Sequence, residues 1–292
     1  MSDDTAVAVF EAHRPVLTGV AYRMLGRFAD AEDVVQETWL RWDGADRAAV
    51  REPRAFLVRT TTRLAIDRLR HVQSRRESYV GEWLPEPLTT DGPSAAADAE
   101  ERVLLAETVS FAMLVLLESL SPLERAVFVL REAFGYPYAE IAAVLDRGEP
   151  AVRQLAGRAR RHVEERQPRY DADPVVGAEV TERFLAACVG GDLEGLMALL
   201  APDVRLMGDG GGVQKAPLRV IETASKVGRF LHAISSDTPP DAAVTFREVN
   251  GAPAIVITTH GRPHTVVALE TRDGRIACVY LLTNPGKLTG IR

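Results

Sequence analysis

The chain contains few cysteines, few aromatic residues and no long apolar run. Its two cysteines, Cys188 and Cys278, lie 90 positions apart, which excludes both a disulfide framework and a CxxC metal pair. No segment reaches the roughly 18 consecutive apolar residues that a membrane-spanning helix needs. The acidic start, Met1–Thr5, is unlike a signal peptide. The sequence therefore predicts a cytoplasmic protein that does not enter the membrane.

A net positive charge is also absent, since the formal charge at pH 7 is −6. The charges are nevertheless unevenly distributed along the chain. Residues 51–76 hold eight arginines against two acids, and residues 147–161 hold five arginines against one acid. Residues 82–107, in contrast, hold seven acids against one arginine. Because the field at a surface depends on charges within a Debye length of about 8–10 Å, the basic segments predict two nucleic-acid contacts. The acidic segments predict a different partner.

Apolar residues at helical spacing predict helices over most of the first 76 residues. One helix buries a stripe from Leu17 to Leu25, and a second should be capped by Asp30. A third begins near Pro53 and carries arginines opposite its apolar stripe. In this helix Asp67, four residues after Arg63, is expected to be its ion partner.

Residues 138–163 predict a helix-turn-helix, preceded by a further helix that starts near Ser121. Ser121 and Glu124 form a capping box, Gly135 ends the helix that follows, and residues 146–148 form the turn before the last helix. The exposed side of that helix suits DNA, with early residues at base edges and later cations on phosphates. These residues are Glu149, Arg153, Gln154, Arg158, Arg160 and Arg161. The alternative is a solvated helix end whose arginines suit the helix dipole.

Residue Gly157 lies within this last helix and lowers helix stability by about 1 kcal/mol relative to alanine.

After Arg169 the pattern changes to two helices near 174–200 and a β-rich half. Expected strands cover 243–249, 254–260, 265–270 and 275–282. Asn250-Gly251 and Asp273-Gly274 are hairpin turns that need positive φ. Helices followed by a meander predict an α+β domain with a curved antiparallel sheet.

Three segments carry a resemblance to a known family. They are DAEDVVQETWL from Asp30, FLVRTTTRLAIDRLR from Phe56, and YAEIAAVLD from Tyr138 with AVRQL from Ala151. They closely resemble bacterial RNA polymerase sigma factors of the extracytoplasmic-function class. The resemblance implies two all-α sigma domains, at 1–76 and 105–168, the second containing the helix-turn-helix. A linker at 77–104 joins them. Sigma factors of this class usually end after the second domain, and residues 174–292 separately resemble the SnoaL-like (NTF2-like) cone domains of the α+β class.

The implied function is to bind core RNA polymerase and direct promoter-specific transcription initiation, without catalytic activity or cofactor. The residues implied to dock on core polymerase are Asp30, Glu32, Asp33, Gln36 and Glu37. Those implied to contact the −10 element are Arg59, Arg63, Arg68, Arg70, Arg75 and Arg76. The exposed residues of the last helix, named above, would read the −35 element.

Three further elements resemble marks of the sigma J-type subgroup, which carries the extra domain. They are Trp83, Leu84, Pro85, Glu86 and Pro87; Asp209, Gly210, Gly211 and Gly212; and Asn284, Pro285, Lys287 and Leu288. The second departs from the expected pattern because two residues precede Lys215, and Gly286 stands where an acid is usual. The resemblance implies that this domain packs on the linker and the helical domains to regulate polymerase engagement. No separate anti-sigma factor would then be required, and the free chain is expected to be a monomer.

Two alternatives stay open. One is a helix-turn-helix regulator that binds its operator as a symmetric dimer and senses a ligand through the extension. The other is a polyketide cyclase-like enzyme with a regulatory arm, in which Asp209 and either His260 or His264 form an acid–base pair. The sequence also predicts that Trp83 is buried against another part of the chain and that Cys278 is a buried strand residue.

Overall fold

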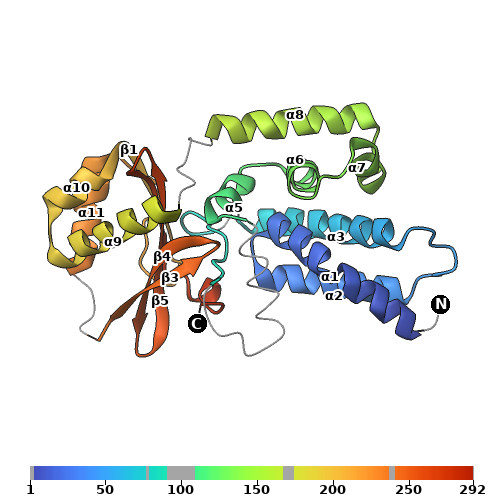
Figure 1. Cartoon of the computed structure of the whole chain (residues 1–292), viewed down its shortest axis with the longest axis horizontal. Helices are drawn as coiled ribbons and strands as arrows, with labels where there is room; N and C mark the ends of the chain where they lie inside the picture. Colours follow the sequence, from blue (N-terminus) through green and yellow to red (C-terminus); the bar gives the residue numbers. More distant parts are fainter. Residues whose placement is uncertain (1–2, 77–78, 91–108, 167–173, 237–240, 292) are drawn as a thin grey trace. The chain divides into compact units, whose positions relative to one another are not determined.

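The computed structural model describes residues 3–76, 79–90, 109–166, 174–236 and 241–291 (Figure 1). The chain divides into two compact units. The helical unit comprises residues 1–77 and 113–167, and the sheet unit comprises residues 78–112 and 168–292. The segment that joins the two halves of the helical unit therefore belongs to the sheet unit. No helix among the described residues is long and apolar enough to cross a membrane.

The first half of the helical unit is built from three helices, α1 (Asp3–Leu25), α2 (Phe28–Asp43) and α3 (Pro53–Arg76). The predicted apolar stripe of α1 is buried, and α3 begins at Pro53 as expected. Trp42 donates its indole N–H to the Ala6 carbonyl at 3.1 Å, which ties α2 to α1. The predicted cap is wrong, because α2 begins at Phe28 and Asp30 lies inside its first turn. There the carboxylate still complements the positive end of the helix dipole.

The second half of the helical unit contains α5 (Phe111–Glu118), α6 (Pro122–Phe128), the π-helical turn η1 (Val129–Ala133), α7 (Tyr138–Leu145) and α8 (Glu149–Arg166). The predicted capping box is confirmed: Ser121 Oγ accepts from the Glu124 N–H, and Glu124 accepts from the Ser121 N–H. Gly135 adopts φ +71° after η1, which ends the helix there. Asp146, at φ 55°, starts the turn between α7 and α8.

The sheet unit contains helices α9 (Pro174–Gly190), α10 (Leu193–Leu199) and α11 (Ala224–Ser236). Its strands are β1 (Leu200–Asp209), β2 (Ile221–Glu222), β3 (Ala243–Val249), β4 (Ala252–Thr259), β5 (Arg262–Arg272) and β6 (Arg275–Leu282), followed by the 3-10 turn η2 (Pro285–Lys287). The strand order is β2-β1-β6-β5-β4-β3. This is the expected α+β class.

The sheet is mixed, which corrects the purely antiparallel sheet expected from the sequence. β3 to β6 form the predicted meander, but β1 pairs parallel with β6. The sequence analysis missed β1 because Pro202, Asp203 and Gly208 are poor strand formers. It also missed α11, which contains Gly228. Both predicted hairpin turns are confirmed, with positive φ at Asn250-Gly251 and Asp273-Gly274.

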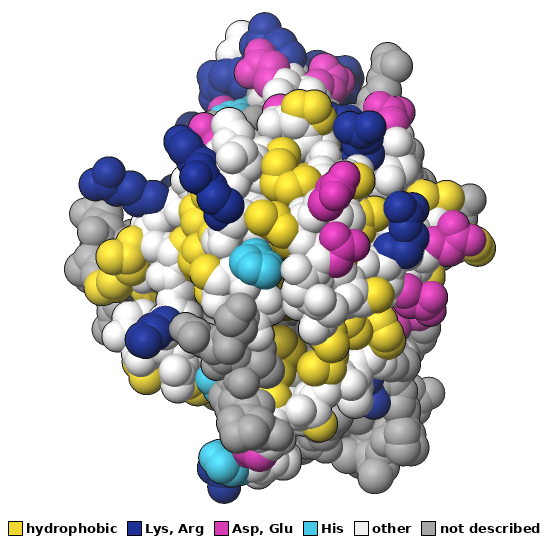
Figure 2. Space-filling model, turned by 90° about the vertical axis from the view of Figure 1, so that its left-hand side faces the viewer, with side chains coloured by type: hydrophobic (Ala, Val, Ile, Leu, Met, Phe, Trp, Pro, Cys, Tyr) yellow, Lys and Arg dark blue, Asp and Glu magenta, His cyan; other side chains and the backbone are white. Residues whose placement is uncertain are grey.

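The core of the sheet unit lies between the sheet and its three helices. Leu206, Ile255 and Val279 project from the strands toward Phe184 of α9 and Leu231 of α11. Figure 1 shows α9, α10 and α11 on this side of the sheet. Figure 2 faces the same side of the molecule, where acidic and basic side chains of the described residues are interspersed among apolar ones. Such a mixed surface differs from the single-sign stripe that binds nucleic acid.

The capping box gives a test of the second helical half. Ser121→Ala removes the side-chain acceptor of the Glu124 N–H and should lower the stability of the helical unit by about 1 kcal/mol. Urea denaturation of the whole chain, followed by circular dichroism, measures this as a lower midpoint of the helical transition. Ser225→Ala, at an exposed position of α11, is the matched control and should leave that midpoint unchanged. Equal midpoints for both variants would contradict the cap.

Candidate functional site

Three of the acids expected to dock on polymerase are already engaged within the helical unit. Arg68 of α3 donates to Asp30 Oδ1 at 2.7 Å and to Asp33 Oδ2 at 3.0 Å. The hydrogen bond that Arg68 donates to Asp30 raises the pKa of Arg68 above its ordinary value, so the guanidinium stays charged. Glu37 pairs with Arg41 at 2.7 Å, one turn later on the exposed side of α2. The acidic surface of α2 is therefore partly neutralised by neighbouring arginines.

The arginines of α3 have different surroundings. Arg59 is exposed, and Arg70 pairs with Asp67 at 3.3 Å. Arg63 instead donates its Nε–H to the Val144 carbonyl of α7 at 3.0 Å, so its predicted pairing with Asp67 is wrong. Arg75 and Arg76 continue the helix, but their side chains lie outside the described residues.

The exposed residues of α8 also separate into two groups. Arg158 pairs with Glu124 of α6 at 3.0 Å, and Arg160 pairs with Glu132 of η1 at 2.7 Å. Although burial raises the pKa of Glu124, hydrogen bonds from Ser121 and Arg158 outweigh this effect and hold the pKa below its usual value. These two arginines therefore help to fix α8 against α6 and η1.

The early part of α8 is arranged around Tyr138. Arg153 pairs with Glu149 at 2.5 Å and lies 4.6 Å from the centre of the Tyr138 ring. Gln154 and Arg161 are exposed on the same helix. The residues predicted to read base edges thus lie at the N-terminal half of α8, next to the turn that begins at Asp146.

Within the helical unit, α3 and its neighbours contact the helix-turn-helix half directly. In addition to the Arg63–Val144 bond, Arg125 of α6 donates to the Met24 carbonyl at 2.8 Å, at the end of α1. Arg125 is fully buried and pairs with Glu118 at 2.9 Å. The Arg54 guanidinium lies 5.3 Å from the Tyr136 ring. The two halves of the helical unit therefore pack together through polar and charged contacts.

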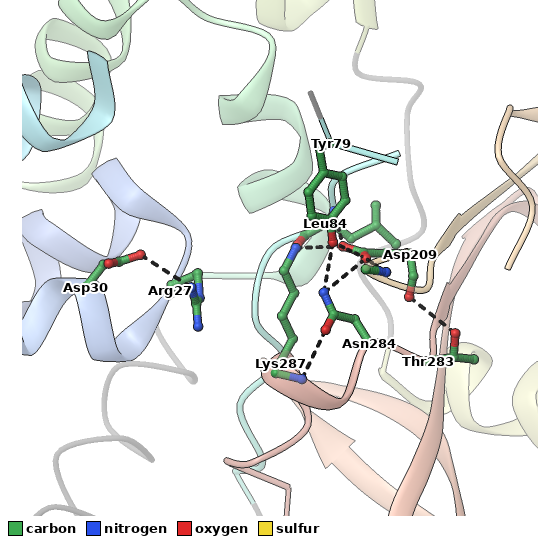
Figure 3. A network of polar contacts seen from close by, with 10 residues as sticks. Arg27, Asp30, Tyr79, Leu84, Asp209, Thr283, Asn284 and Lys287 are labelled. Atoms are coloured by element: carbon green, nitrogen blue, oxygen red, sulfur yellow. Dashed lines mark hydrogen bonds and ion pairs between the residues drawn. The ribbon is translucent and has the colours of Figure 1, made fainter. Parts of the chain in front are cut away.

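The linker is held by a buried ion pair in the sheet unit. Lys287 Nζ lies 2.6 Å from Asp209 Oδ2, and the two side chains are 4% and 0% exposed. We call the residues around this pair the linker clamp; they are Tyr79, Trp83, Leu84, Asp209, Asn284 and Lys287 (Figure 3). Three of them belong to the linker and three to the folded C-terminal domain. The clamp thus joins segments about 130–200 positions apart in sequence.

Three polar groups of the linker, the Tyr79 hydroxyl and the Leu84 N–H and carbonyl, meet partners in the C-terminal domain. The Tyr79 hydroxyl donates to Asp209 Oδ1 at 2.5 Å, and the Leu84 N–H donates to Oδ2 at 2.9 Å. Lys287 Nζ donates to the Leu84 carbonyl and lies 3.8 Å from the centre of the Trp83 ring. Asn284 Nδ2 donates to the Tyr79 hydroxyl at 2.8 Å. Because the lysine is placed over an aromatic face, the indole also stabilises its charge.

The DGGG segment forms the bend that this geometry requires. Gly211 and Gly212 have φ of +65° and +71°, and the Gly211 N–H donates to Asp209 Oδ1 at 3.0 Å. A Cβ at Gly211 would lie 2.6 Å from Asn284. Glycine is therefore needed there both for the left-handed backbone and for the close approach of Asn284. Lys215, which follows the bend, is exposed, and Lys287 supplies the charge beside Asp209.

A second set of contacts fixes the linker further along. The Leu88 N–H donates to Asn250 Oδ1 at 3.1 Å, and the Asn250 N–H donates to the Leu88 carbonyl at 2.9 Å. Thr89 forms an antiparallel bridge with Val249, so this part of the linker pairs with the end of β3. At the other end of the linker, Phe111 packs edge-on against Tyr280 of β6 at 5.3 Å. The linker is therefore held at both ends of its described part.

The two groups expected for acid–base chemistry do not meet in one site. His260 is 87% exposed and lies 2.9 Å from Asp241, whereas His264 hydrogen-bonds to Thr265. Asp209 is engaged by Lys287 and the linker.

Burial raises the pKa of the Cys278 thiol to about 12, and burial raises that of Cys188 to about 11. Both thiols are thus protonated at neutral pH.

The sequence analysis missed several residues of these contacts. Tyr79 has no distinguishing pattern, and Asn250 was interpreted only as a turn residue. Arg125 follows the capping box, and nothing in its spacing indicates that it is fully buried. Trp83 was predicted to be buried, but it is only half-buried beside Lys287. Of the expected regulatory residues, Trp83, Leu84, Asp209, Gly211, Asn284 and Lys287 meet in the clamp.

Comparisons with known proteins find relatives over nearly the whole chain. Residues 9–76 match the family described as Sigma-70 region 2, and residues 110–163 match Sigma-70, region 4. The chain is 40% identical to the extracytoplasmic-function RNA polymerase sigma factor SigJ of Mycobacterium tuberculosis, over 97% of this chain and 93% of that protein. It is 32% identical to the protein described as probable sigma factor SigI of the same species, over 99% and 97% of the two chains. The crystal structure of SigJ matches 97% of this chain and 98% of its own, with a TM-score of 0.77 and 37% identity.

The clamp gives a direct structural test. Lys287→Met leaves a buried carboxylate without its cation, which should destabilise the clamped linker by about 3–5 kcal/mol. Hydrogen exchange of the full chain, measured by mass spectrometry, should then show faster exchange of amides in residues 84–90, because the Leu84 and Thr90 amides lose their acceptors.

The matched control is Lys226→Met, at an exposed position of α11. It removes the same charge from the same unit and should leave linker exchange as in the parent chain. If Lys287→Met also left exchange in residues 84–90 unchanged, the ion pair would not hold the linker.

Proposed function

Because the chain belongs to the extracytoplasmic-function sigma factors and carries a C-terminal SnoaL-like (NTF2-like) domain, we propose that this domain regulates polymerase engagement through the linker clamp. The observation that carries the proposal is the buried Lys287–Asp209 pair, which is completed by linker residues Tyr79, Trp83 and Leu84. A sigma factor binds core RNA polymerase and promoter DNA, and the chain offers a separate surface for each contact.

The proposed contacts follow the charges of the helical unit. The exposed acids of α2, together with Gln36, dock on core polymerase. Arg59 and Arg70 of α3 contact the −10 element with the basic residues that follow them, and the early residues of α8 read the −35 element. Arg68, Arg158 and Arg160 hold carboxylates in the free chain, and their role in these contacts depends on exchanging those partners for phosphate.

The packing within the helical unit supports a closed free form. The −10 and −35 elements are named from positions about 25 base pairs apart, or on the order of 85 Å at roughly 3.4 Å per base pair. In the free chain, α3 touches α7 through the 3.0 Å bond from Arg63 to Val144. Helices in direct contact cannot reach two sites so far apart. The two halves of the helical unit must therefore separate when the chain engages a promoter.

The linker clamp is placed to control this separation. Residues 77–110 are the covalent connection between α3 and α5, so any increase in the distance between the two halves must draw on this segment. Contacts at Tyr79 and Leu84, and again at Leu88 to Thr90, fix its first part to the C-terminal domain. Release of these contacts lengthens the available connection. The clamped chain is the closed, inactive form in this proposal.

In this mechanism the regulatory domain and the sigma domains that it regulates belong to the same chain. We therefore propose that no separate anti-sigma factor is required, that the free chain is a monomer, and that it acts in the cytoplasm, where RNA polymerase is. We propose no catalytic role for the C-terminal domain. Its Asp209 is neutralised by Lys287, and apolar side chains such as Phe184, Leu231 and Val279 fill the space between sheet and helices.

Runoff transcription with purified chain and core polymerase tests the proposal. Lys287→Met should increase core binding and transcript by about tenfold or more, because each 1.4 kcal/mol lost from the closed form shifts the opening equilibrium by about tenfold. Lys226→Met should behave as the parent chain. A Lys287→Met variant with faster linker exchange but unchanged or reduced transcript would contradict a clamp that inhibits. Absence of core binding by every variant would contradict the polymerase contact itself.

Promoter reading by α8 is tested at Arg153, which lies on its early exposed side. Arg153→Ala should weaken recognition of the −35 element by about 1–3 kcal/mol and relax the preference at one base position. Binding of holoenzyme to promoter variants, each changed at one −35 position, measures this effect. Arg183→Ala, an exposed arginine on α9, is the control. An equal loss on all DNA sequences would identify Arg153 as a phosphate contact instead.

A further inference from the structure

Nothing in the described part of the free chain explains why Gly157 is a glycine. It lies inside α8, where glycine is the poorest helix former after proline. Its φ is not positive, and a Cβ built on it meets no atom within 4 Å. Gly228 of α11 differs, because a Cβ there would lie 2.5 Å from Met197 Sδ. Gly228 is thus required by packing, whereas Gly157 serves neither the fold nor the backbone conformation.

The side of α8 that contains Gly157 is hollow and basic. Gln154, Gly157, Arg158 and Arg161 follow the i, i+3, i+4, i+7 spacing of one helix side, and together they line a depression of about 530 Å³. The other side of the helix is buried at Val152, Ala159 and Val163. Two guanidinium groups and an amide beside a glycine, which has no side chain, suit an anionic occupant that accepts hydrogen bonds.

We propose that Gly157 is a specificity-determining position at which the backbone of α8 approaches a base edge of the −35 element most closely. A Cβ would add about 1.5 Å between the helix axis and the DNA, since that is the length of a C–C bond. Without it, a base edge approaches the backbone at Gly157, and Gln154 donates to its acceptors, while Arg158 exchanges Glu124 for the neighbouring phosphate. The inference rests on the proposed reading of the −35 element by α8.

The geometry favours DNA over a small anion. The four residues lie along two turns of a helix, so their donors extend along a line and do not converge on one point. A recognition helix in the major groove presents such a line to successive base pairs. Arg161, at the end of the line, is positioned for the phosphate backbone beyond the contacted bases.

The Gly157→Ala variant distinguishes the effect of this glycine on stability from its effect on DNA recognition. Alanine should raise the melting temperature of the full chain by a few degrees, because it favours the helix and meets nothing in the free chain. Holoenzyme formed with the variant should then be incubated with a promoter library randomised over the −35 element, and the bound DNA sequenced. The variant should shift base preference at one or two adjacent positions and weaken binding to the parent's preferred sequence by about tenfold.

Gly177→Ala on α9 is the matched control. It is the same substitution inside a helix, and its Cβ would make an ordinary 4.0 Å contact with Pro253. It should leave the enriched sequences unchanged. An identical enrichment profile for Gly157→Ala and the parent would overturn the inference, as would an equal loss on every sequence. If the parent holoenzyme enriched no −35 sequence at all, the proposed role of α8 would fail instead.

Discussion

The buried pair of Lys287 and Asp209 is the interaction on which the hold of the C-terminal domain on the linker depends. Moving two charges out of water costs several kcal/mol for each ion, and mutual attraction offsets this only when the remaining hydrogen-bonding atoms are satisfied. Here the linker supplies about half of the hydrogen bonds that satisfy these atoms. Tyr79 and Leu84 donate to the carboxylate, and the Leu84 carbonyl and Trp83 ring receive the ammonium group. The pair and the bound linker therefore stabilise each other.

A polar clamp of this kind is suited to release. If the linker leaves, water replaces Tyr79 and Leu84 around the two charges, so the exchange of hydrogen bonds has a modest net free energy. A purely apolar contact of the same area would lose about 25 cal/mol for each Å² exposed, without such compensation. The glycines of the bend contribute geometry rather than energy, since Gly211 allows Asn284 to approach Asp209 and Tyr79. The clamp therefore holds the linker in one position and can still release it.

The sequence predicted the helices of the helical unit and the meander of the sheet unit because their signals are local. Apolar spacing, the Ser121 capping box and the two glycine-containing hairpins each lie within a few residues of the structure they specify. The β1 strand was not predictable in this way, since its pairing with β6 joins residues about 70 positions apart. The same limit applies to the clamp. Trp83, Asp209 and Lys287 were identified through family resemblance, but the participation of Tyr79 depends on a contact across 130 positions.

Arginine spacing predicts more DNA contacts than the free chain has available, because several of these arginines are held in ion pairs. Arg68, Arg158 and Arg160 hold carboxylates in exposed ion pairs, which typically contribute only about 0–1 kcal/mol. A polyanion can compete for such arginines at little cost. Arg125 is fully buried between Glu118 and the Met24 carbonyl, where losing its partners would leave a desolvated charge. The exposed pairs can therefore be exchanged for phosphate when DNA arrives. In the proposed mechanism, separation of the two halves of the helical unit depends on freeing the buried arginine, and this requirement makes the closed form the resting one.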